Sequence, residues 1–170
     1  MDDVAAPTSP GINTMTSDIR IREGTIADLD IVLYHRLHMF LEMGYSNDEK
    51  MITSQQNSQG FFARALEQGT YKPWFAETAS GQIVAGGGIV LTIRASTPKH
   101  PELLRAEILN VYTEPAFRRQ GLARDLMLTM IAWCKKERFS WVSLHASDAG
   151  RPLYDSLGFK PTKEMRLELG

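Results

Sequence analysis

A strand that runs through a short turn into an amphipathic helix, and from there into a second strand, constrains the fold more than any other feature. The first strand is RAEILNVYT, residues 105–113, and the second is SWVSLHA, residues 140–146. The helix between them is expected from about Leu122 to Glu137, and its apolar face carries Leu122, Leu126, Met130 and Trp133. Because parallel strands need a crossover connection of about this length, the segment predicts one β-α-β unit.

The other expected strands pair differently. DIRIRE, residues 18–23, alternates isoleucine with charged residues, as a strand does. WFAET and QIVAGGGIVLTIR flank the turn 79–82 and predict an antiparallel hairpin, and MRLEL, residues 165–169, is predicted to close the chain as a strand. One parallel crossover among such strands predicts an α/β (α+β) domain with a mixed sheet flanked by helices, rather than a doubly wound fold.

Three further helices are expected. Thr25 can cap the first, with Asp28 in the capping-box position, and Gly44 suits its end. The second is expected from about Asp48 to Gln68, and its buried end would carry Phe61, Phe62, Ala65 and Leu66. The third lies in GRPLYDSLGF, residues 150–159, where Pro152 fits the first turn and Gly158 the end.

Composition limits the function. The chain has 170 residues, 43% hydrophobic and 23% charged, which predicts one domain over 18–170. The first 17 residues are expected to be a disordered tail, and whether Met15 is the native start stays open. A net charge of -1 argues against a nucleic-acid partner. The sequence has no apolar run of about 18 residues, so no membrane-spanning helix is expected. One cysteine, Cys134, excludes an internal disulfide and argues against a metal cluster.

The turn before the central helix, EPAFRRQGLARDL, has two interpretations. The first turn of a helix has unpaired N–H groups, and a glycine such as Gly121 lets an anion approach the backbone. The alternative is a surface turn with two solvated charges, Arg118 and Arg119. The chain contains neither a Walker A loop nor the G-x-G-x-x-G dinucleotide fingerprint. The run Gly86–Gly88 predicts a bulge or tight packing, or else close approach of a ligand.

These residues carry a resemblance to a known family. RRQGLA, with Arg118, Gly121 and Ala123, resembles the [QR]-x-x-G-x-[GA] pattern of the GNAT superfamily of acetyl-CoA-dependent N-acetyltransferases. PLYDSLGF is similar to the family's L-Y-x-x-x-G-F near the C-terminus, and the expected element order fits the family's sheet. The resemblance covers about Ile19 to Leu169 and implies a GNAT-like fold with a centrally splayed sheet.

The resemblance also implies a binding mode for acetyl-CoA as cosubstrate. Its pantetheine arm would pair with the end of the strand that includes Val111, Tyr112 and Thr113, and its pyrophosphate would sit on the backbone amides of the following helix start. Ser147 stands where the family often has an asparagine that contacts the cofactor; its side chain is shorter than asparagine, but its hydroxyl can still form a hydrogen bond. The helix-start set is Arg118, Arg119, Gln120, Gly121, Leu122, Ala123 and Arg124.

Two side chains are assigned to catalysis by the same resemblance. Tyr154 would be the general acid that protonates or hydrogen-bonds the leaving thiolate, and Glu107, a charge inside an apolar strand, would be the base that deprotonates the amine. Glu114, His145 and a water chain stay open as alternative bases. Each histidine is otherwise interpreted as structural or exposed.

The predicted function is therefore transfer of acetyl from acetyl-CoA to a primary amine of a small molecule or peptide, by direct attack in a ternary complex and with no metal. The alternative is a non-catalytic acyl-CoA-binding sensor or partner module of the same fold. The segment HMFLEMGYSNDEK would line the acceptor site, and its Glu42, Asp48 and Glu49 would suit a cationic amine. A cytoplasmic location fits, a homodimer is left open, and the acceptor is not identified.

Overall fold

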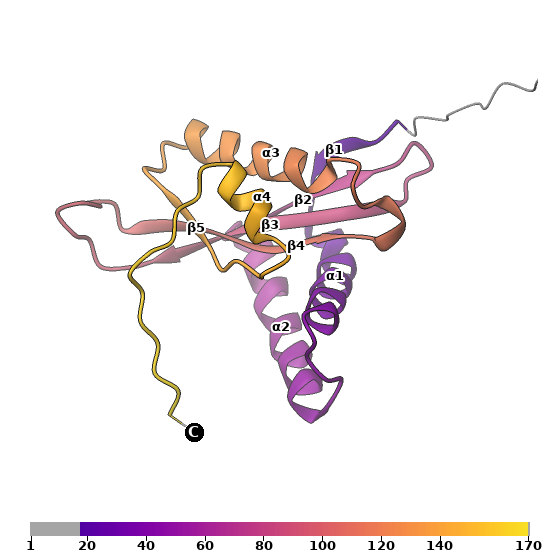
Figure 1. The fold of residues 1–170 in the computed structure, drawn as a ribbon, viewed down its shortest axis with the longest axis horizontal. Coiled ribbons are helices and arrows are strands. Elements are labelled where there is room, and N and C mark those ends of the chain that lie inside the picture. The colour runs from indigo at the N-terminus through magenta and orange to yellow at the C-terminus, as the bar shows by residue number, and fades with distance from the viewer. Residues whose placement is uncertain (1–17, 170) are drawn as a thin grey trace, which may run out of the picture.

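The computed structural model describes residues 18–169, which form one five-stranded sheet with helices on both faces (Figure 1). The expected tail of residues 1–17 lies outside the described residues. The strand order is β1-β2-β3-β4-β5; the first four strands pair antiparallel, and β4 and β5 pair in parallel. The strands are β1 (Arg20–Glu23), β2 (Tyr71–Glu77), β3 (Ile83–Ile93), β4 (Leu104–Thr113) and β5 (Val142–Leu144). The predicted mixed sheet is thus confirmed.

The helices begin and end close to the predicted residues. They are α1 (Leu29–Glu42), α2 (Glu49–Glu67), α3 (Leu122–Lys136) and α4 (Arg151–Ser156), with short 3₁₀ turns η1 (Ile26–Asp28) and η2 (Pro115–Phe117). Thr25 and Asp28 form the expected capping box, and the Asp48 side chain accepts hydrogen bonds from the amides of Lys50 and Met51. Gly44 and Gly158 follow α1 and α4 with positive φ, which confirms the predicted helix ends.

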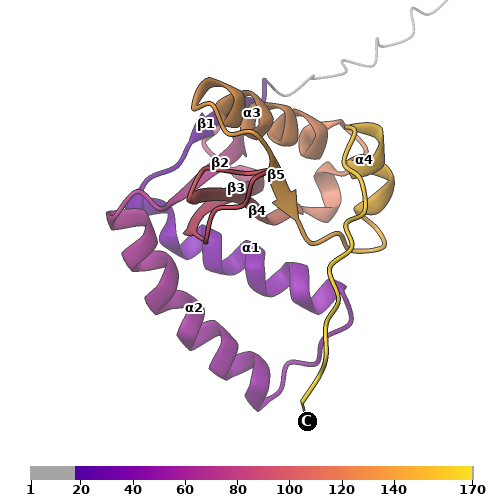
Figure 2. The ribbon, with the colours of Figure 1, turned by 90° about the vertical axis from the view of Figure 1, so that its left-hand side faces the viewer.

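The two faces of the sheet bury separate apolar clusters. In Figures 1 and 2, α3 and α4 cover one face and α1 and α2 the other. Leu126, Met127 and Met130 of α3 are fully buried against the first face. Val32 of α1 and Phe62 of α2 are buried against the second. Phe61, expected to be buried, is instead 43% exposed.

The glycine run in β3 is explained by packing. A Cβ at Gly86 would lie 2.8 Å from His35 Nδ1 and 2.8 Å from Phe75 Cδ1, and a Cβ at Gly88 would collide with the Tyr71 ring. The register between β3 and β4 also shifts between Gly86 and Gly88, as a β-bulge requires. The prediction of a bulge with tight packing is therefore confirmed.

The predicted closing strand is wrong. Residues 159–169 have no regular secondary structure, and they run past β5 without pairing with it (Figure 2). Met165, Leu167 and Leu169 are 94%, 80% and 90% exposed. Alternating apolar and polar residues only indicate which side chains would lie on each face of a strand. A strand forms only where a neighbouring strand can pair with its backbone N–H and C=O groups.

Candidate active site

Strands β4 and β5, at one edge of the sheet, separate beyond a short paired stretch. Their parallel pairing covers only Ala106–Ile108 and Val142–Leu144, whereas β4 continues to Thr113. Asn110, just beyond the last pair, has a φ of 58°, which few non-glycine residues adopt. The predicted residues Val111, Tyr112 and Thr113 follow it, on the part of β4 that has no partner on the β5 side. An extended ligand could pair with this free edge.

The turn that follows β4 places unpaired backbone amides at the start of α3. Within residues 18–169, none of the N–H groups from Arg119 to Arg124 has a hydrogen-bond partner; the first helical bond comes from Asp125 N to Gly121 O at 3.0 Å. Gly121 precedes the helix with a φ of 86°, and a Cβ there would meet nothing within 4 Å. This open helix start, with Leu122 and Ala123 in its first turn, can hold an anion.

Two of the three arginine side chains of this turn, those of Arg118 and Arg124, are bonded to other parts of the protein. The Arg118 guanidinium contacts both oxygens of Glu42 at 2.6 Å and donates through Nε to Thr113 O at 2.9 Å. Arg124 Nη1 donates to Ser156 Oγ at 3.0 Å, while Arg119, with a φ of 60°, and Gln120 are exposed. The backbone thus offers the anion site, and the charges surround it.

Tyr154 lies on α4 and is 9% exposed. Its ring packs beside Gly150, where a Cβ would come within 2.7 Å of the ring, and it meets Phe159 edge-on at 6.1 Å. No residue in the range 18–169 forms a hydrogen bond with its hydroxyl. Burial raises the pKa of the phenol, so the group is protonated at neutral pH and can donate a proton or a hydrogen bond.

Glu107 and His145 form a hydrogen-bonded pair across the β4–β5 junction. Glu107 Oε1 lies 3.0 Å from His145 Nδ1, and the carboxylate side chain is only 18% exposed. On the far side of the ring, Arg166 Nη2 lies 3.1 Å from His145 Nε2. An arginine can only donate, so Nε2 accepts and the ring proton lies on Nδ1, where it is donated to Glu107. The pair can therefore take up a proton as a unit.

The other candidate bases and the predicted Ser147 are placed differently. Glu114 lies in the turn after β4, with Oε1 4.0 Å from Nε2 of buried His35. Burial lowers the pKa of His35 to about 4, so this histidine is neutral at pH 7. Ser147 Oγ accepts a hydrogen bond from Gly150 N at 3.2 Å, which fixes the turn that leads into α4. The structure does not bring Glu114 and Glu107 together.

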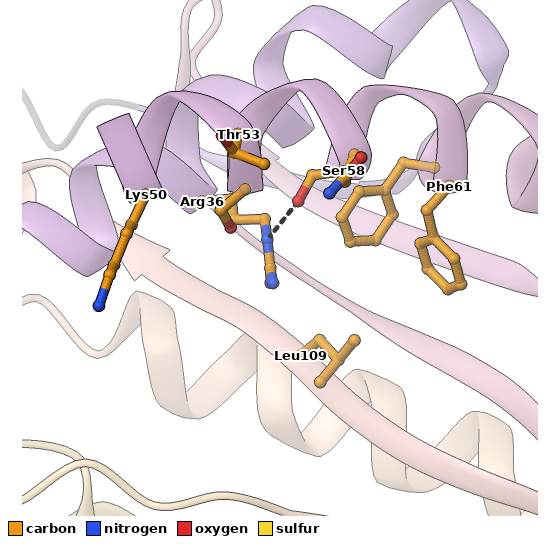
Figure 3. A pocket seen from close by; sticks show the side chains of 9 residues that line it. Arg36, Lys50, Thr53, Ser58, Phe61 and Leu109 are labelled. Atoms are coloured by element: carbon orange, nitrogen blue, oxygen red, sulfur yellow. Dashed lines mark hydrogen bonds between the residues drawn. The ribbon is translucent and has the colours of Figure 1, made fainter. Parts of the chain in front are cut away.

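A pocket on the α1–α2 side of β4 was missed by the sequence analysis (Figure 3). Arg36 projects into it from α1, while α2 and Leu109 of β4 supply much of the wall. The sequence does contain a signal for this pocket, because Arg36 interrupts the apolar stripe of the helix: it stands four residues after Val32 and four before Phe40. A charged residue in such a stripe calls for a partner or a role.

Two of the three carboxylates expected in the acceptor wall are engaged. Glu42 pairs with Arg118, and Asp48 caps α2.

Cys134 is buried in α3, and burial raises its thiol pKa to about 11. Within the described part of the chain, no three His, Cys, Asp or Glu side chains gather as a metal site would require. None of the helices in that part is long and apolar enough to cross a membrane.

The chain resembles known acetyltransferases in sequence and in fold. Residues 70–161 match the family model "Acetyltransferase (GNAT) domain". A GCN5-related N-acetyltransferase from Ralstonia eutropha JMP134 is 31% identical, with a TM-score of 0.84 over 89% of this chain and 98% of its own. A predicted acetyltransferase with acetyl-CoA from Clostridium acetobutylicum is 25% identical, with a TM-score of 0.79 over 89% and 96%.

A more distant structure shares the fold alone. Glucosamine-6-phosphate N-acetyltransferase from Arabidopsis thaliana is 16% identical, with a TM-score of 0.64 over 89% of this chain and 99% of its own. The comparison with curated proteins returned no match. The matched domain and the Ralstonia structure each cover more than half of this chain, and they agree with the mixed sheet described above. The chain belongs to the GNAT superfamily of acetyltransferases.

Proposed function

We propose that the protein transfers an acetyl group from acetyl-CoA to a primary amine, by direct attack of the amine in a ternary complex. The observation that carries this proposal is the run of unpaired amides from Arg119 to Arg124 beside the splayed edge of β4. These are the groups that would hold a pyrophosphate and an extended pantetheine arm. The Clostridium structure was determined with acetyl-CoA, which supports the same cosubstrate here.

The residues present fit that cosubstrate. The pyrophosphate would be held by the amides around Gly121, which has no side chain to block them, and the arm by the backbone of Val111 and Thr113. Acetyl-CoA supplies an activated thioester. Transfer breaks its C–S bond and forms an amide C–N bond, while the amine loses a proton and the thiolate gains one.

The amine's proton is assigned to the Glu107–His145 pair. An alkyl amine is mostly protonated at neutral pH and cannot attack until it loses a proton. Glu107 orients His145 and stabilises its protonated ring, so either the carboxylate or Nε2 can receive the proton, directly or through a water. Arg166 must leave Nε2 before that nitrogen accepts, and it is exposed enough to do so.

The proton for the leaving thiolate is assigned to Tyr154. Its hydroxyl is protonated at neutral pH and free of internal hydrogen bonds among residues 18–169, so it can turn to a ligand. Cys134 is buried in α3 with its thiol protonated, which supports direct transfer rather than an acetyl-cysteine relay.

The test is release of free thiol from acetyl-CoA with a panel of amines, alongside calorimetry with acetyl-CoA alone. Binding together with amine-dependent thiol release is the expected result. Tight binding with no turnover on any amine would instead indicate an acyl-CoA-binding module. Failure to bind acetyl-CoA would remove the proposed function altogether.

A further inference from the structure

The pocket between α1, α2 and β4 is large enough for a small molecule, with a volume of about 600 Å³. Figure 3 shows Arg36 in its middle, Lys50 toward one end, Phe61 toward the other, and Leu109 projecting from β4. The full lining is Arg36, Lys50, Thr53, Ser54, Asn57, Ser58, Phe61, Phe62 and Leu109. It therefore holds two cations, four short polar side chains and three apolar ones, and no carboxylate.

Arg36 is a half-buried cation whose bonds all go to neutral groups. Its Nε donates to Ser58 Oγ at 3.1 Å and its Nη1 to Asn110 Oδ1 at 2.8 Å. Its guanidinium also lies 4.7 Å from the centre of the Phe40 ring. Burial lowers the pKa of Arg36, which reflects the cost of keeping the charge away from water.

Comparison with Arg22 and Arg118 shows that Arg36 lacks a carboxylate partner among residues 18–169. Arg22 pairs with Asp28 and Glu77, and Arg118 pairs with Glu42. No carboxylate within residues 18–169 forms an ion pair with Arg36, and the hydrogen bonds given above leave Nη2 free to donate. A fixed, forked donor with one free nitrogen, held by neutral partners, is suited to a carboxylate or phosphate from outside the chain.

The pocket lies beside the groups assigned to proton removal. Leu109 packs with the cluster under α1 and α2, and Glu107 stands two residues earlier on the same strand, before the bulge. Residues two apart share a face of a strand and lie about 7 Å apart. A molecule whose amine approaches Glu107 would therefore extend its other end over Leu109 toward Arg36.

We propose that the acceptor is an amine that also carries a carboxylate or phosphate, and that Arg36 binds this anionic group while Lys50 adds charge at the pocket mouth. The inference rests on the proposed function, since it concerns the same acceptor. Phe61, Phe62 and Leu109 would contact an apolar linker between the amine and the anion. The cationic acceptor suggested by the sequence fits this pocket less well, because Glu42 and Asp48 are engaged.

The test compares matched pairs of amines in the thiol-release assay. Aminoalkanoates from glycine to 6-aminohexanoate, and a set of α-amino acids, are each paired with the neutral carboxamide. Aminoalkyl phosphates form a separate arm that distinguishes phosphate from carboxylate. We expect the acid to exceed its amide in kcat/KM by about 10-fold or more, since a hydrogen-bonded charge contributes that much to binding.

Variants assign this preference to the pocket. Arg36→Gln should bring the acid-to-amide ratio close to one, and Arg36→Lys, which keeps the charge without the fork, should leave an intermediate ratio. Lys50→Gln, at an exposed position, should lower the ratio by a few fold without a change in Tm. Arg94→Gln is the matched control, because it removes the same charge from an exposed position just after β3 and should keep the full ratio.

Two outcomes would overturn the inference while the proposed function survives. One is thiol release with equal efficiency for acids and amides; the other is an acid preference that persists in Arg36→Gln and Lys50→Gln. If no amine releases thiol, the proposed function fails. Calorimetry of the same pairs in the presence of CoA then decides the inference, which requires acids to bind more tightly than amides in the wild-type protein and not in the variants.

Discussion

The two candidate binding sites of this molecule are built from different chemical groups. At the start of α3, the groups offered to a ligand are backbone amides, and the nearby arginine side chains are exposed or bonded to other parts of the protein. In the pocket under α2, the groups offered are side chains from two helices and a strand, centred on Arg36. A backbone site depends on local conformation, whereas a side-chain site depends on residue identity and on the packing that places it.

The comparison predicts the effect of each substitution. Changes of side chain at the α3 start should matter little unless they add bulk or alter the backbone. Changes in the groups around β4, β5 and α4 should alter the chemical step or the choice of acceptor.

The largest effect is expected for Tyr154→Phe. Loss of the hydroxyl should lower kcat by about 10²-fold, because the thiolate then leaves without a proton donor. The KM for acetyl-CoA should stay within a few fold, since the ring still packs beside Gly150 and Phe159. Steady-state kinetics measures both, and unchanged turnover would remove Tyr154 from the mechanism.

Glu107→Gln should lower kcat/KM for the amine by some tens of fold and flatten its rise with pH. The carboxamide keeps the shape but cannot stabilise a protonated His145. His145→Gln should flatten the same profile, and the double variant should be little worse than either alone, as expected for residues that act as a unit. A pH profile identical to that of the wild-type protein would point to Glu114 or to water.

Gly121→Ala should raise the KM for acetyl-CoA by about 10-fold, because a Cβ would project into the space above the free amides. Alanine in this left-handed conformation is also strained, so the substitution should lower the free energy of unfolding by about 1–2 kcal/mol. Gly81→Ala is the control, because its φ of 84° carries the same strain in the β2–β3 turn, far in sequence from the site. Equal KM changes in both variants would show that the α3 start is not a binding site.

Arg118→Gln should have the smallest effect. It breaks the ion pair with Glu42, but both side chains are about 40% exposed, so the free energy of unfolding should change by less than about 1 kcal/mol. The KM for acetyl-CoA should change less than threefold if the amides carry the binding. A tenfold or larger increase would mean that the anion site depends on its side chains after all.

The same contrast explains what the sequence could predict. The α3 start was found because all its signals, a strand, Pro115, Gly121 and an amphipathic helix, lie within one short segment. The Arg36 pocket needs α1, α2 and β4 brought together from positions about 70 residues apart, as in the hydrogen bond from Arg36 to Asn110. The pairing of Glu107 with His145 likewise joins two strands across a helix, and the sequence left the two as rival bases.

The failed prediction at residues 165–169 has a related cause. Their alternation of apolar and charged residues is typical of a strand, but a strand also needs a pairing partner, which no local pattern identifies. In the structure this segment instead brings Arg166 to His145, a contact that the sequence did not indicate.

The glycine run of β3 has a consequence for how this chain can vary. Tyr71 occupies the space that a side chain at position 88 would need, and Phe75 and His35 occupy the space at position 86. A larger residue can be accepted at 86 or 88 only if the facing ring becomes smaller. Positions 71 and 88, and likewise positions 75 and 86, are therefore expected to change together among relatives of this chain. A larger side chain on one strand would be matched by a smaller one on the other, so that the total side-chain volume of each pair is kept.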